Sequence, residues 1–395
     1  MSKEKITLNK KGIISNFQIV GEAKVNDYTY KIDEKSDNSS WIYNSLNLGV
    51  DCGENGIVYS EMMGGYFSDG DNVIYAHGKD DEGKDNFDDK VVVDWEDRTN
   101  EKYLENIGDM CFITVGLEKK ENDKTFYKKF LSAYDAIAYI KEHLENGMVV
   151  NIKGNIKYQF YKGNVSVKKE ITSIVLSSAE KSKYRANFTQ TLLIDKDSVG
   201  KLDKEKGIIP IYARVIDYVG KYNGKPIKLY LPFNKTFEFA VNTEDPEKIK
   251  KAINLIFKVK KDITEITFEG KFYEGATIVN ATVDDLTDDL KEMVELGLMS
   301  EEEALSKCVV STNREKRMIL IKPYFKPIKK EGEVPQMSKI ENRYKEEDLV
   351  FDFDTIFGDN EDEIAEEVVN STTKEKAVDS ANDDDDTAWL EELGI

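Results

Sequence analysis

The stretch that decides the fold is residues 132–176, SAYDAIAYIKEHLENGMVVNIKGNIKYQFYKGNVSVKKEITSIVL. A capping-box pattern begins at Ser132, and apolar residues then recur at helical spacing until Gly147, so this part predicts an amphipathic helix. Beyond the glycine, apolar and polar residues alternate, which is typical of a half-buried strand. YKGN at 161–164 predicts a tight turn, and the alternation then resumes in a second strand.

The same order of elements returns about 116 residues later. A second helix is predicted to begin at Asp245 and Pro246, and residues 263–283 predict a strand, a turn containing glycine and another strand. The two copies share the pattern VNIKGNI around Gly154 and ITFEGKF around Gly270. Glycine inside a strand predicts a bulge or a sharp bend, which lets a short sheet curl. We therefore expect two small curled sheets.

Further strands are predicted upstream of both helices. Before the second helix they cover residues 208–219, 225–233 and 236–241. Before the first helix the candidates are residues 12–25, 41–50 and 55–63, followed by an insertion around 68–109 and by the strands CFITVGL and TFYKKFLS. The sequence leaves open which of these strands close the first sheet.

Charge is distributed very unevenly along the 395 residues, whose formal net charge is -20. Residues 346–395 hold 19 Asp and Glu and 2 Lys, so the rest of the chain carries a net charge of only -3. Residues 147–185 and 313–345 each carry a net charge of about +6. The total charge alone argues against a nucleic-acid partner, but a nearly neutral body with basic segments is compatible with one.

Cysteine use and hydropathy indicate the compartment. The three cysteines form no CxxC pair and are odd in number, so we expect neither a disulfide framework nor a zinc knuckle. No apolar run approaches the roughly 20 residues that a membrane-spanning helix needs, and the first residues lack the apolar stretch of a signal peptide. A cytoplasmic protein without a cofactor is expected.

Three strands, a helix and two strands, with glycine bends, is the order of the five-stranded OB barrel. Two such copies followed by an acidic tail with a hydrophobic tip resemble the single-stranded DNA-binding proteins, in particular the tailed-phage replication type. The resemblance covers residues 12–285 by element order and 383–395 by the character of the tail. It implies a protein that coats single strands in replication, recombination or repair, and a tail that competes with DNA and recruits partner proteins. Bacterial members of this family end in Pro-Phe and several phage members end in Phe, whereas this chain ends in WLEELGI.

The expected organisation is mainly β with some α-helix, in four parts. Residues 1–180 form an OB-like domain with the insertion, and 187–285 form a second one. A helical extension and a basic arm containing prolines occupy 286–345, and 346–395 are an acidic tail whose composition predicts disorder.

Binding a single strand requires cations for the phosphates and flat side chains on which bases stack. Both occur together on the predicted hairpins and between the two domains. The candidate nucleic-acid-binding residues are Tyr127, Lys128, Lys153, Lys157, Tyr161, Lys162, Lys168, Lys183, Tyr184, Arg185, Arg214, Tyr218, Lys221, Tyr222, Lys225, Lys228 and Tyr230. The alternative for each residue is that the tyrosine packs the sheet and the lysine protects an exposed edge. Tyr158 shares the parity of apolar residues and is expected in the core.

The tail offers a second candidate site. Thr387 is predicted to cap a last helical turn that presents apolar side chains to a partner protein, namely Trp389, Leu390, Leu393 and Ile395. DLVFDFDTIFGD, residues 348–359, also mixes aromatic and acidic residues, as do disordered segments that fold on a partner. An adaptor protein that acts through this tail is therefore an alternative function.

Signals for an enzyme are few. The two histidines, His77 and His143, lie far apart, and no GxxxxGK[ST] phosphate loop occurs. The acidic clusters DWED, 94–97, and EDE, 361–363, are possible magnesium ligands for a nuclease, but such clusters also arise by composition in so acidic a chain. The basic arm MILIKPYFKPIKK lacks the amphipathic period of a membrane-surface element. We expect a binding protein without catalytic activity.

Overall fold

The computed structural model describes residues 8, 12–120, 124–161, 164–222, 225–276, 286–301, 304–305, 314–327, 334–341 and 343–350. The chain is mainly β. In the N-terminal part the strands are β1 (Ser15–Lys24), β2 (Tyr30–Lys35), β3 (Trp41–Asp51), β4 (Ile57–Phe67), β5 (Val73–Lys79), β6 (Asp85–Asp94), β7 (Ile113–Lys119), β8 (Thr125–Phe130), β9 (Val149–Tyr161) and β10 (Asn164–Leu176). In the C-terminal part they are β11 (Arg185–Ile194), β12 (Ile208–Tyr222), β13 (Lys225–Ala240), β14 (Thr264–Ala276), β15 (Arg314–Pro323) and β16 (Lys339–Glu341).

Helices are few and short in this part of the chain. The α-helices are α1 (Glu101–Leu104), α2 (Ala133–His143), α3 (Pro246–Phe257) and α4 (Asp288–Glu295). The 3-10 helices named below are η2 (Trp95–Asp97), η3 (Asp109–Cys111), η4 (Lys181–Lys183) and η6 (Glu346–Leu349). Across the described residues, none of the helices has the length and apolar character needed to cross a membrane.

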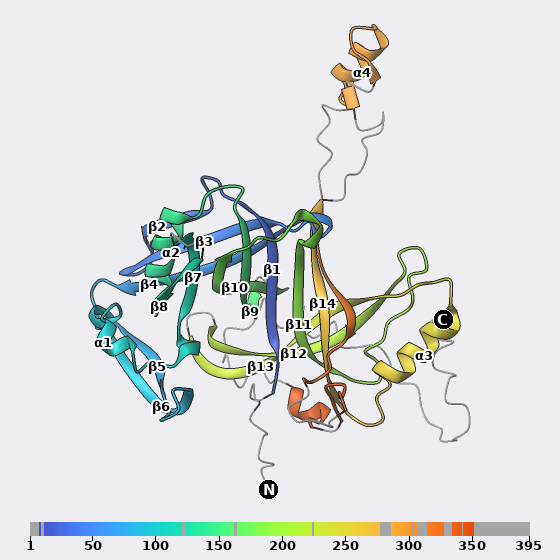
Figure 1. Cartoon of the computed structure of the whole chain (residues 1–395). Coiled ribbons are helices and arrows are strands. Elements are labelled where there is room, and N and C mark those ends of the chain that lie inside the picture. Colours follow the sequence, from blue (N-terminus) through green and yellow to red (C-terminus); the bar gives the residue numbers. More distant parts are fainter. Residues whose placement is uncertain are drawn as a thin grey trace.

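Both predicted amphipathic helices are confirmed. The Ser132 hydroxyl accepts a hydrogen bond from Tyr134 N at the start of α2, and the Asp245 carboxylate does the same for Lys248 N at the start of α3. Pro246 occupies the first turn of α3, where its missing N–H costs no hydrogen bond. The predicted helix after residue 286 is also confirmed, as α4, which Figure 1 shows away from the sheet.

Strand pairing produces two closed circuits of five strands each. In the first unit the hydrogen-bonded order is β1, β3, β4, β10, β9 and back to β1, and the β4–β10 contact is parallel. In the second unit it is β11, β12, β13, β15, β14 and back to β11, again with the third and fifth strands parallel. The helices α2 and α3 each follow the third strand of their unit. The two units are therefore copies of one topology.

The two units share one sheet through β1 and β11, which pair antiparallel at the centre of the molecule (Figure 1). Phe17 lies opposite Phe188 in this register. Each of these rings also packs over the glycine of its own unit, because Phe17 pairs with Gly154 and Phe188 pairs with Gly270. The equivalent strands of the two repeats, β1 and β11, thus pair with each other around a local twofold axis.

The two repeat glycines allow strands to approach closely. A Cβ on Gly154 would lie 1.9 Å from the Glu170 carbonyl oxygen, and one on Gly270 would lie 2.2 Å from the Phe188 ring. A register shift occurs opposite each glycine, where the partner strand holds one extra residue, Thr172 on β10 and Ile321 on β15. The pairing is therefore irregular at both glycines, but the bulges lie on the partner strands and not on the glycine strands where they were predicted.

The strand expected over 208–219 is confirmed as β12, but the other two strands expected before the second helix were assigned wrongly. The expected strands over 225–233 and 236–241 are one strand, β13, because Leu231, Phe233, Phe237 and Phe239 keep one parity and share one buried face. The first strand of the unit is β11, which the sequence analysis did not identify. The break expected at residues 234–235 relied on local turn residues, whereas the buried face of β13 continues through these two positions.

In the predicted hairpin over 263–283 the first strand is confirmed, but the predicted turn is wrong, because Gly270 and Gly275 both lie within that strand. Residues 264–276 form the single strand β14, and its partner is β15, which lies in the segment expected to be a basic arm. Met318, Ile319 and Leu320 of β15 are buried in the sheet, and Pro323 stands at its end, where a missing N–H is tolerated. The second half of the expected hairpin, residues 277–283, lies outside the described residues.

The inserted segment after β4 forms a separate two-stranded sheet of β5 and β6, followed by α1 and η3. It packs through a small apolar cluster of its own, Val93, Ile107, Phe112 and Leu131. Strands β7 and β8 then return the chain to the large sheet beside β10.

The start of the acidic tail is ordered, which differs from the expected boundary at 346. Residues 346–349 form η6, and Leu349 is buried with Leu8, Leu193 and Ile216. Burial of this leucine holds the segment on the second unit, in spite of its acidic neighbours. Residues 351–395 of the predicted disordered tail lie outside the described residues.

Candidate nucleic-acid interface

The outer face of β3 and β4 carries the candidate site. Leu46, Leu48 and Val50 of β3 and Val58 of β4 are no more than 1% exposed, so the odd-numbered residues of both strands face outward. The antiparallel register places these outward residues side by side. They are Trp41, Tyr43, Ser45 and Asn47 on β3, and Tyr59, Glu61, Met63 and Phe67 on β4.

Aromatic rings occupy much of this face. Trp41 lies opposite Phe67, with ring centroids 4.9 Å apart. Tyr59 lies opposite Gly49, and a Cβ on that glycine would approach the tyrosine ring to 3.1 Å. The missing side chain lets the Tyr59 ring lie against the sheet.

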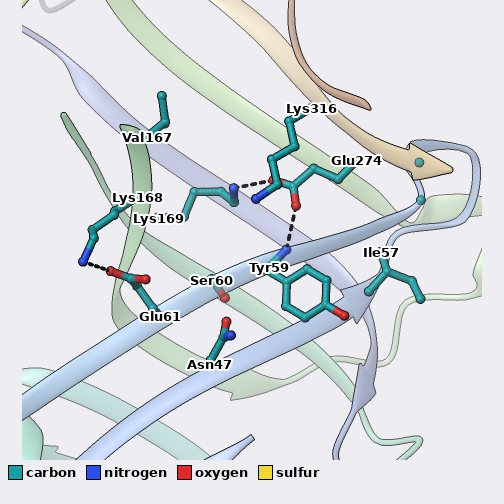
Figure 2. Close-up of a pocket in the computed structure, with 12 residues that line it drawn as sticks. Asn47, Ile57, Tyr59, Ser60, Glu61, Val167, Lys168, Lys169, Glu274 and Lys316 are labelled. Atoms are coloured by element: carbon teal, nitrogen blue, oxygen red, sulfur yellow. Dashed lines mark hydrogen bonds and ion pairs between the residues drawn. The ribbon is translucent and has the colours of Figure 1, made fainter. Parts of the chain in front are cut away.

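Two adjoining cavities of about 550 Å³ and about 520 Å³ run along this face and share Asn47, Glu61 and Lys168. Figure 2 shows the first, which extends from Tyr59 toward Glu274 and Lys316 of the second unit. The second extends past Met63 toward the β9–β10 hairpin and β12. We call this continuous space the groove, and its outer residues are Ser45, Asn47, Tyr59, Glu61, Met63, Lys157, Lys168, Tyr218, Lys221 and Lys316.

The lysines of the groove come from both units. Lys168 Nζ lies 2.9 Å from Glu61 Oε1, and both side chains are about two-fifths exposed at 39% and 41%. Lys157 Nζ lies 3.9 Å from Asp217 Oδ1. Because exposed ion pairs contribute little free energy, a phosphate can compete for Lys168 at small cost.

Asp217 joins the units beneath the groove. Its side chain is 1% exposed, and its two oxygens accept hydrogen bonds from Tyr158 N on β9 and Tyr218 N on β12, both at 2.8 Å. These bonds place the Tyr218 ring, which is 44% exposed, next to Lys157. A buried carboxylate that two backbone amides satisfy thus orients one aromatic and one basic residue of the groove.

A buried ion pair forms the floor of the first cavity (Figure 2). Lys169 Nζ lies 2.5 Å from Glu274 Oε1, and each side chain is 7% exposed. The other oxygen of Glu274 accepts a hydrogen bond from Tyr59 N at 3.3 Å, and the ammonium group lies 4.9 Å from the Phe272 ring centroid. This pair connects β10 of the first unit with β14 of the second.

Four of the predicted DNA-binding residues line the groove together: Lys157, Lys168, Tyr218 and Lys221. Tyr230 supports them from β13, where its ring packs edge-on against Tyr218 at 5.3 Å. Lys228 stands nearby on the same strand with a positive φ of 54°. Tyr158 is 3% exposed and its hydroxyl donates to Gln190, as expected for a core residue; burial raises the pKa of this phenol far above its usual range.

The structure places the other described candidates elsewhere. Tyr127 and Lys128 lie on β8 at the edge of the sheet, and Lys128 Nζ lies 4.6 Å from the Tyr139 ring centroid. Lys153 lines a separate cavity of about 670 Å³ at the β1–β11 junction. Lys183 and Tyr184 belong to the connector around η4, and Arg185 is the first residue of β11. Arg214 forms ion pairs with Asp195 at 3.6 Å and Glu346 at 3.7 Å.

Several predictions lie beyond what the structure describes. The side chains of Tyr161, Tyr222 and Lys225 are outside the described residues, and so is Lys162. The predicted partner-binding residues Trp389, Leu390, Leu393 and Ile395 are outside them as well.

The acidic clusters can be placed in part. Residues 94–97 form the end of β6 and η2, whereas residues 361–363 are not described. Within the described ranges, no group of three or more His, Cys, Asp or Glu side chains is arranged to hold a metal ion.

The aromatic residues Trp41, Tyr43, Tyr59 and Phe67 were missed by the sequence analysis. Their signal is the alternation in WIYNSLN and in IVYSEMMGGYF, in which every second residue points inward and most of these inward residues are apolar, Asn44 and Ser60 being polar exceptions. The aromatic residues occupy the outward positions of this pattern. That placement distinguishes a stacking surface from a core.

Comparisons with known proteins give one family. Two solved structures of the single-stranded DNA-binding protein from Thermus aquaticus, the wild type and a deletion mutant, are similar at 9% identity. The match with the wild type covers 67% of this chain and 86% of the wild-type chain, with a TM-score of 0.29. The match with the mutant covers 67% of this chain and 88% of the mutant chain, with a TM-score of 0.28. Scores this low carry no argument about fold or function. No curated protein sequence matches the chain. The YorF family model matches residues 75–303, from β5 to beyond α4, and because this is more than half of the 395 residues, the chain belongs to the YorF family.

Proposed function

We propose that this protein binds single-stranded DNA in the groove without catalysing a reaction on it. The observation that carries the proposal is the outer face of β3 and β4, where aromatic rings lie beside lysines from both units. Base stacking is worth about 1–3 kcal/mol per base, and lysines neutralise the phosphates. Neither contribution requires a particular base sequence, which suits a protein that coats strands.

We further propose that each five-stranded circuit is an OB-type barrel. The pairing order first, second, third, fifth, fourth strand and the helix after the third strand support this. In OB folds the face of the second and third strands binds oligonucleotides, flanked by the loop between the last two strands. Here that face is β3–β4, and Lys157 and Lys168 stand on the flanking β9–β10 hairpin.

The proposed role is to coat and protect strands during replication, recombination or repair in the cytoplasm, which is a bacterial host's cytoplasm if the protein is encoded by a phage. Support for it is the sequence-independent chemistry of the groove and the length of the face, which continues past Met63 to the Trp41–Phe67 pair.

A titration of the full chain with a fluorescently labelled oligothymidine tests the binding proposal. We expect saturable binding at about 50 mM salt that weakens steadily toward about 300 mM, because the counterions that binding releases from the phosphates gain less entropy when the bulk salt concentration is higher. A labelled RNA of the same length measures the preference for the sugar. Absence of binding at the lower salt, also for a chain that ends at Val350, would refute the proposal.

The tail is proposed to compete with DNA for the groove and to recruit partner proteins. Its first residues support this, since Leu349 anchors η6 on the second unit and Glu346 lies 3.7 Å from Arg214 on β12. The same strand carries Tyr218 and Lys221 to the groove. The acidic residues beyond 350 therefore start from a point next to the proposed binding surface.

Removing residues 351–395 should tighten DNA binding. The shortened chain keeps Leu349 in its buried place, so its fold is preserved. The expected gain is about tenfold at low salt if the tail occupies the groove nine-tenths of the time. Fluorescence titration measures this gain in affinity. The matched control for charge is a full-length variant in which Asp383, Asp384, Asp385 and Asp386 are replaced with asparagine. Unchanged affinity together with loss of a partner protein would instead favour the adaptor function.

A further inference from the structure

Three side chains of the inserted segment meet in an arrangement that the sequence does not reveal. Cys111 Sγ in η3 lies 3.2 Å from His77 Nδ1 in β5, and His77 Nε2 lies 2.7 Å from Asp85 Oδ1 at the start of β6. Cys111 Sγ also lies 3.8 Å from His77 Nε2, so the sulfur is close to both ring nitrogens, whereas the carboxylate contacts Nε2. This order of thiol, imidazole and carboxylate is the one that activates cysteine as a nucleophile.

Backbone contacts hold the three residues in place. Gly108 N donates to the His77 carbonyl at 2.8 Å, and Met110 N donates to Asp85 Oδ1 at 2.9 Å. A Cβ on Gly108 would lie 2.5 Å from both the His77 ring and the Asp85 carboxylate, so the chain passes directly over the pair. On the other side the Phe87 ring packs against the imidazole with centroids 4.5 Å apart. The imidazole therefore has little freedom to turn away from the sulfur.

Asp85 is the carboxylate closest to the imidazole, and other charged groups lie around the site. The hydrogen bond from Met110 N, followed by the one from His77, lowers the pKa of Asp85, so the carboxylate stays ionised beside the imidazole. His77 N–H also donates to Cys111 Sγ at 3.4 Å. Other charged groups nearby are Asp109, which pairs with Lys79 at 3.2 Å and with Lys129 at 2.9 Å, and Asp89 and Lys90, which lie beside Gly78 and opposite His77. The carboxylate in contact with the imidazole is Asp85, so it is the group that balances a positive charge on the ring.

We propose that Cys111 is a nucleophilic cysteine whose thiolate, paired with His77 and Asp85, is oxidised by peroxides to a sulfenic acid. The sulfur attacks one peroxide oxygen, an S–O bond forms and the O–O bond breaks. The sulfur loses two electrons to the peroxide, and the departing hydroxide takes the proton of the His77 imidazolium and leaves as water. This site is independent of the groove and of DNA binding.

Exposure and an internal comparison support the assignment. The His77 and Asp85 side chains are 16% and 19% exposed and Cys111 is partly exposed, so a molecule as small as hydrogen peroxide has access. Cys52 is 0% exposed in the core of the first unit, and burial raises the pKa of its thiol to about 12. The same chain thus holds an inert cysteine as a reference.

The test treats the folded full-length chain with hydrogen peroxide at about pH 7, traps sulfenic acid with dimedone and measures each cysteine peptide by mass spectrometry. We expect Cys111 to be labelled at least about tenfold faster than free cysteine under the same conditions and than Cys52. Labelling of Cys111 no faster than free cysteine would overturn the proposal.

Two variants examine the role of the histidine and the carboxylate. His77→Gln should slow the labelling of Cys111 about tenfold or more, and Asp85→Asn, which keeps a hydrogen-bonding side chain, should slow it less. His143→Gln is the matched control, because His143 lies in α2 next to Glu118 and away from the insertion, and it should leave the rate unchanged. Equal rates in His77→Gln, Asp85→Asn and the unmodified chain would contradict the assignment. Continued protection of Cys52 in each variant shows that the chain has remained folded.

Discussion

Replacing Lys157, Lys168 and Lys221 together with alanine should weaken binding of single-stranded DNA on the order of 100-fold at about 50 mM salt. All three lysines line the groove, two on the β9–β10 hairpin and one on β12. Each phosphate contact on a single strand contributes about 0.7 to the slope of log Kobs against log salt concentration. The slope should therefore become less steep by about 2 in the variant. Titration of a labelled oligothymidine at four or five salt concentrations measures both quantities.

The matched control replaces Lys201, Lys204 and Lys206, which are exposed on the loop between β11 and β12 and lie outside the groove. This variant has the same net charge, and its slope should stay close to that of the unmodified chain. Glu61→Gln adds a change in the opposite direction, because it releases Lys168 from its ion pair and should strengthen binding. An equal loss of slope in both triple variants would mean that the groove is not the binding surface.

Replacing Glu274 with glutamine should lower the free energy of unfolding by about 3 kcal/mol, because it leaves the buried ammonium group of Lys169 without a counter-charge. Each side chain of the pair is 7% exposed, and the pair connects β10 with β14. The lost stability should therefore weaken the contact between the two units. The double variant Lys169→Met with Glu274→Leu removes both charges and should recover stability to within about 1 kcal/mol of the unmodified chain. Urea denaturation followed by tryptophan fluorescence measures these differences.

A second ion pair on β14 provides the control. Glu269 lies 3.0 Å from Lys322, but its side chain is 40% exposed and the lysine is 63% exposed. Glu269→Gln should change the free energy of unfolding by less than about 1 kcal/mol, since water screens exposed pairs. If Glu274→Gln proved as harmless as Glu269→Gln, the buried pair would not stabilise the junction.

The sequence predicted the types of residue that line the groove, but not how they come together. Lysine and tyrosine on hairpins indicated the right chemistry, and Lys157, Lys168, Tyr218 and Lys221 do lie together. Their meeting depends on β12 reaching across to the first unit, where Asp217 accepts hydrogen bonds from Tyr158 N and Tyr218 N. No local pattern encodes a contact between residues 59 positions apart. Tyr127 and Lys128 have the same local pattern but stand at the far edge of the sheet.

The thiol site also could not be predicted from the sequence. His77 and Cys111 are 34 residues apart, and the sequence offers two isolated residues with no recognisable spacing. The β5–β6 pairing and the turn at Gly108 bring them within hydrogen-bonding distance. A triad of this kind is defined by geometry, so its members become visible after folding and not before.

By itself the sequence determined the local elements of this protein: α2 and α3 with their caps, the alternating strands, the repeated glycine pattern and the uneven charge. Those features depend on residues up to about four positions apart, and their physical causes are capping, periodicity and backbone sterics. Tertiary structure alone decided that β15 and not a local hairpin closes the second unit, and that β1 and β11 join the units with Phe17 opposite Phe188. Which strand pairs with which depends on how buried faces such as those of β13 and β15 pack across the core, and these faces belong to residues far apart in the sequence.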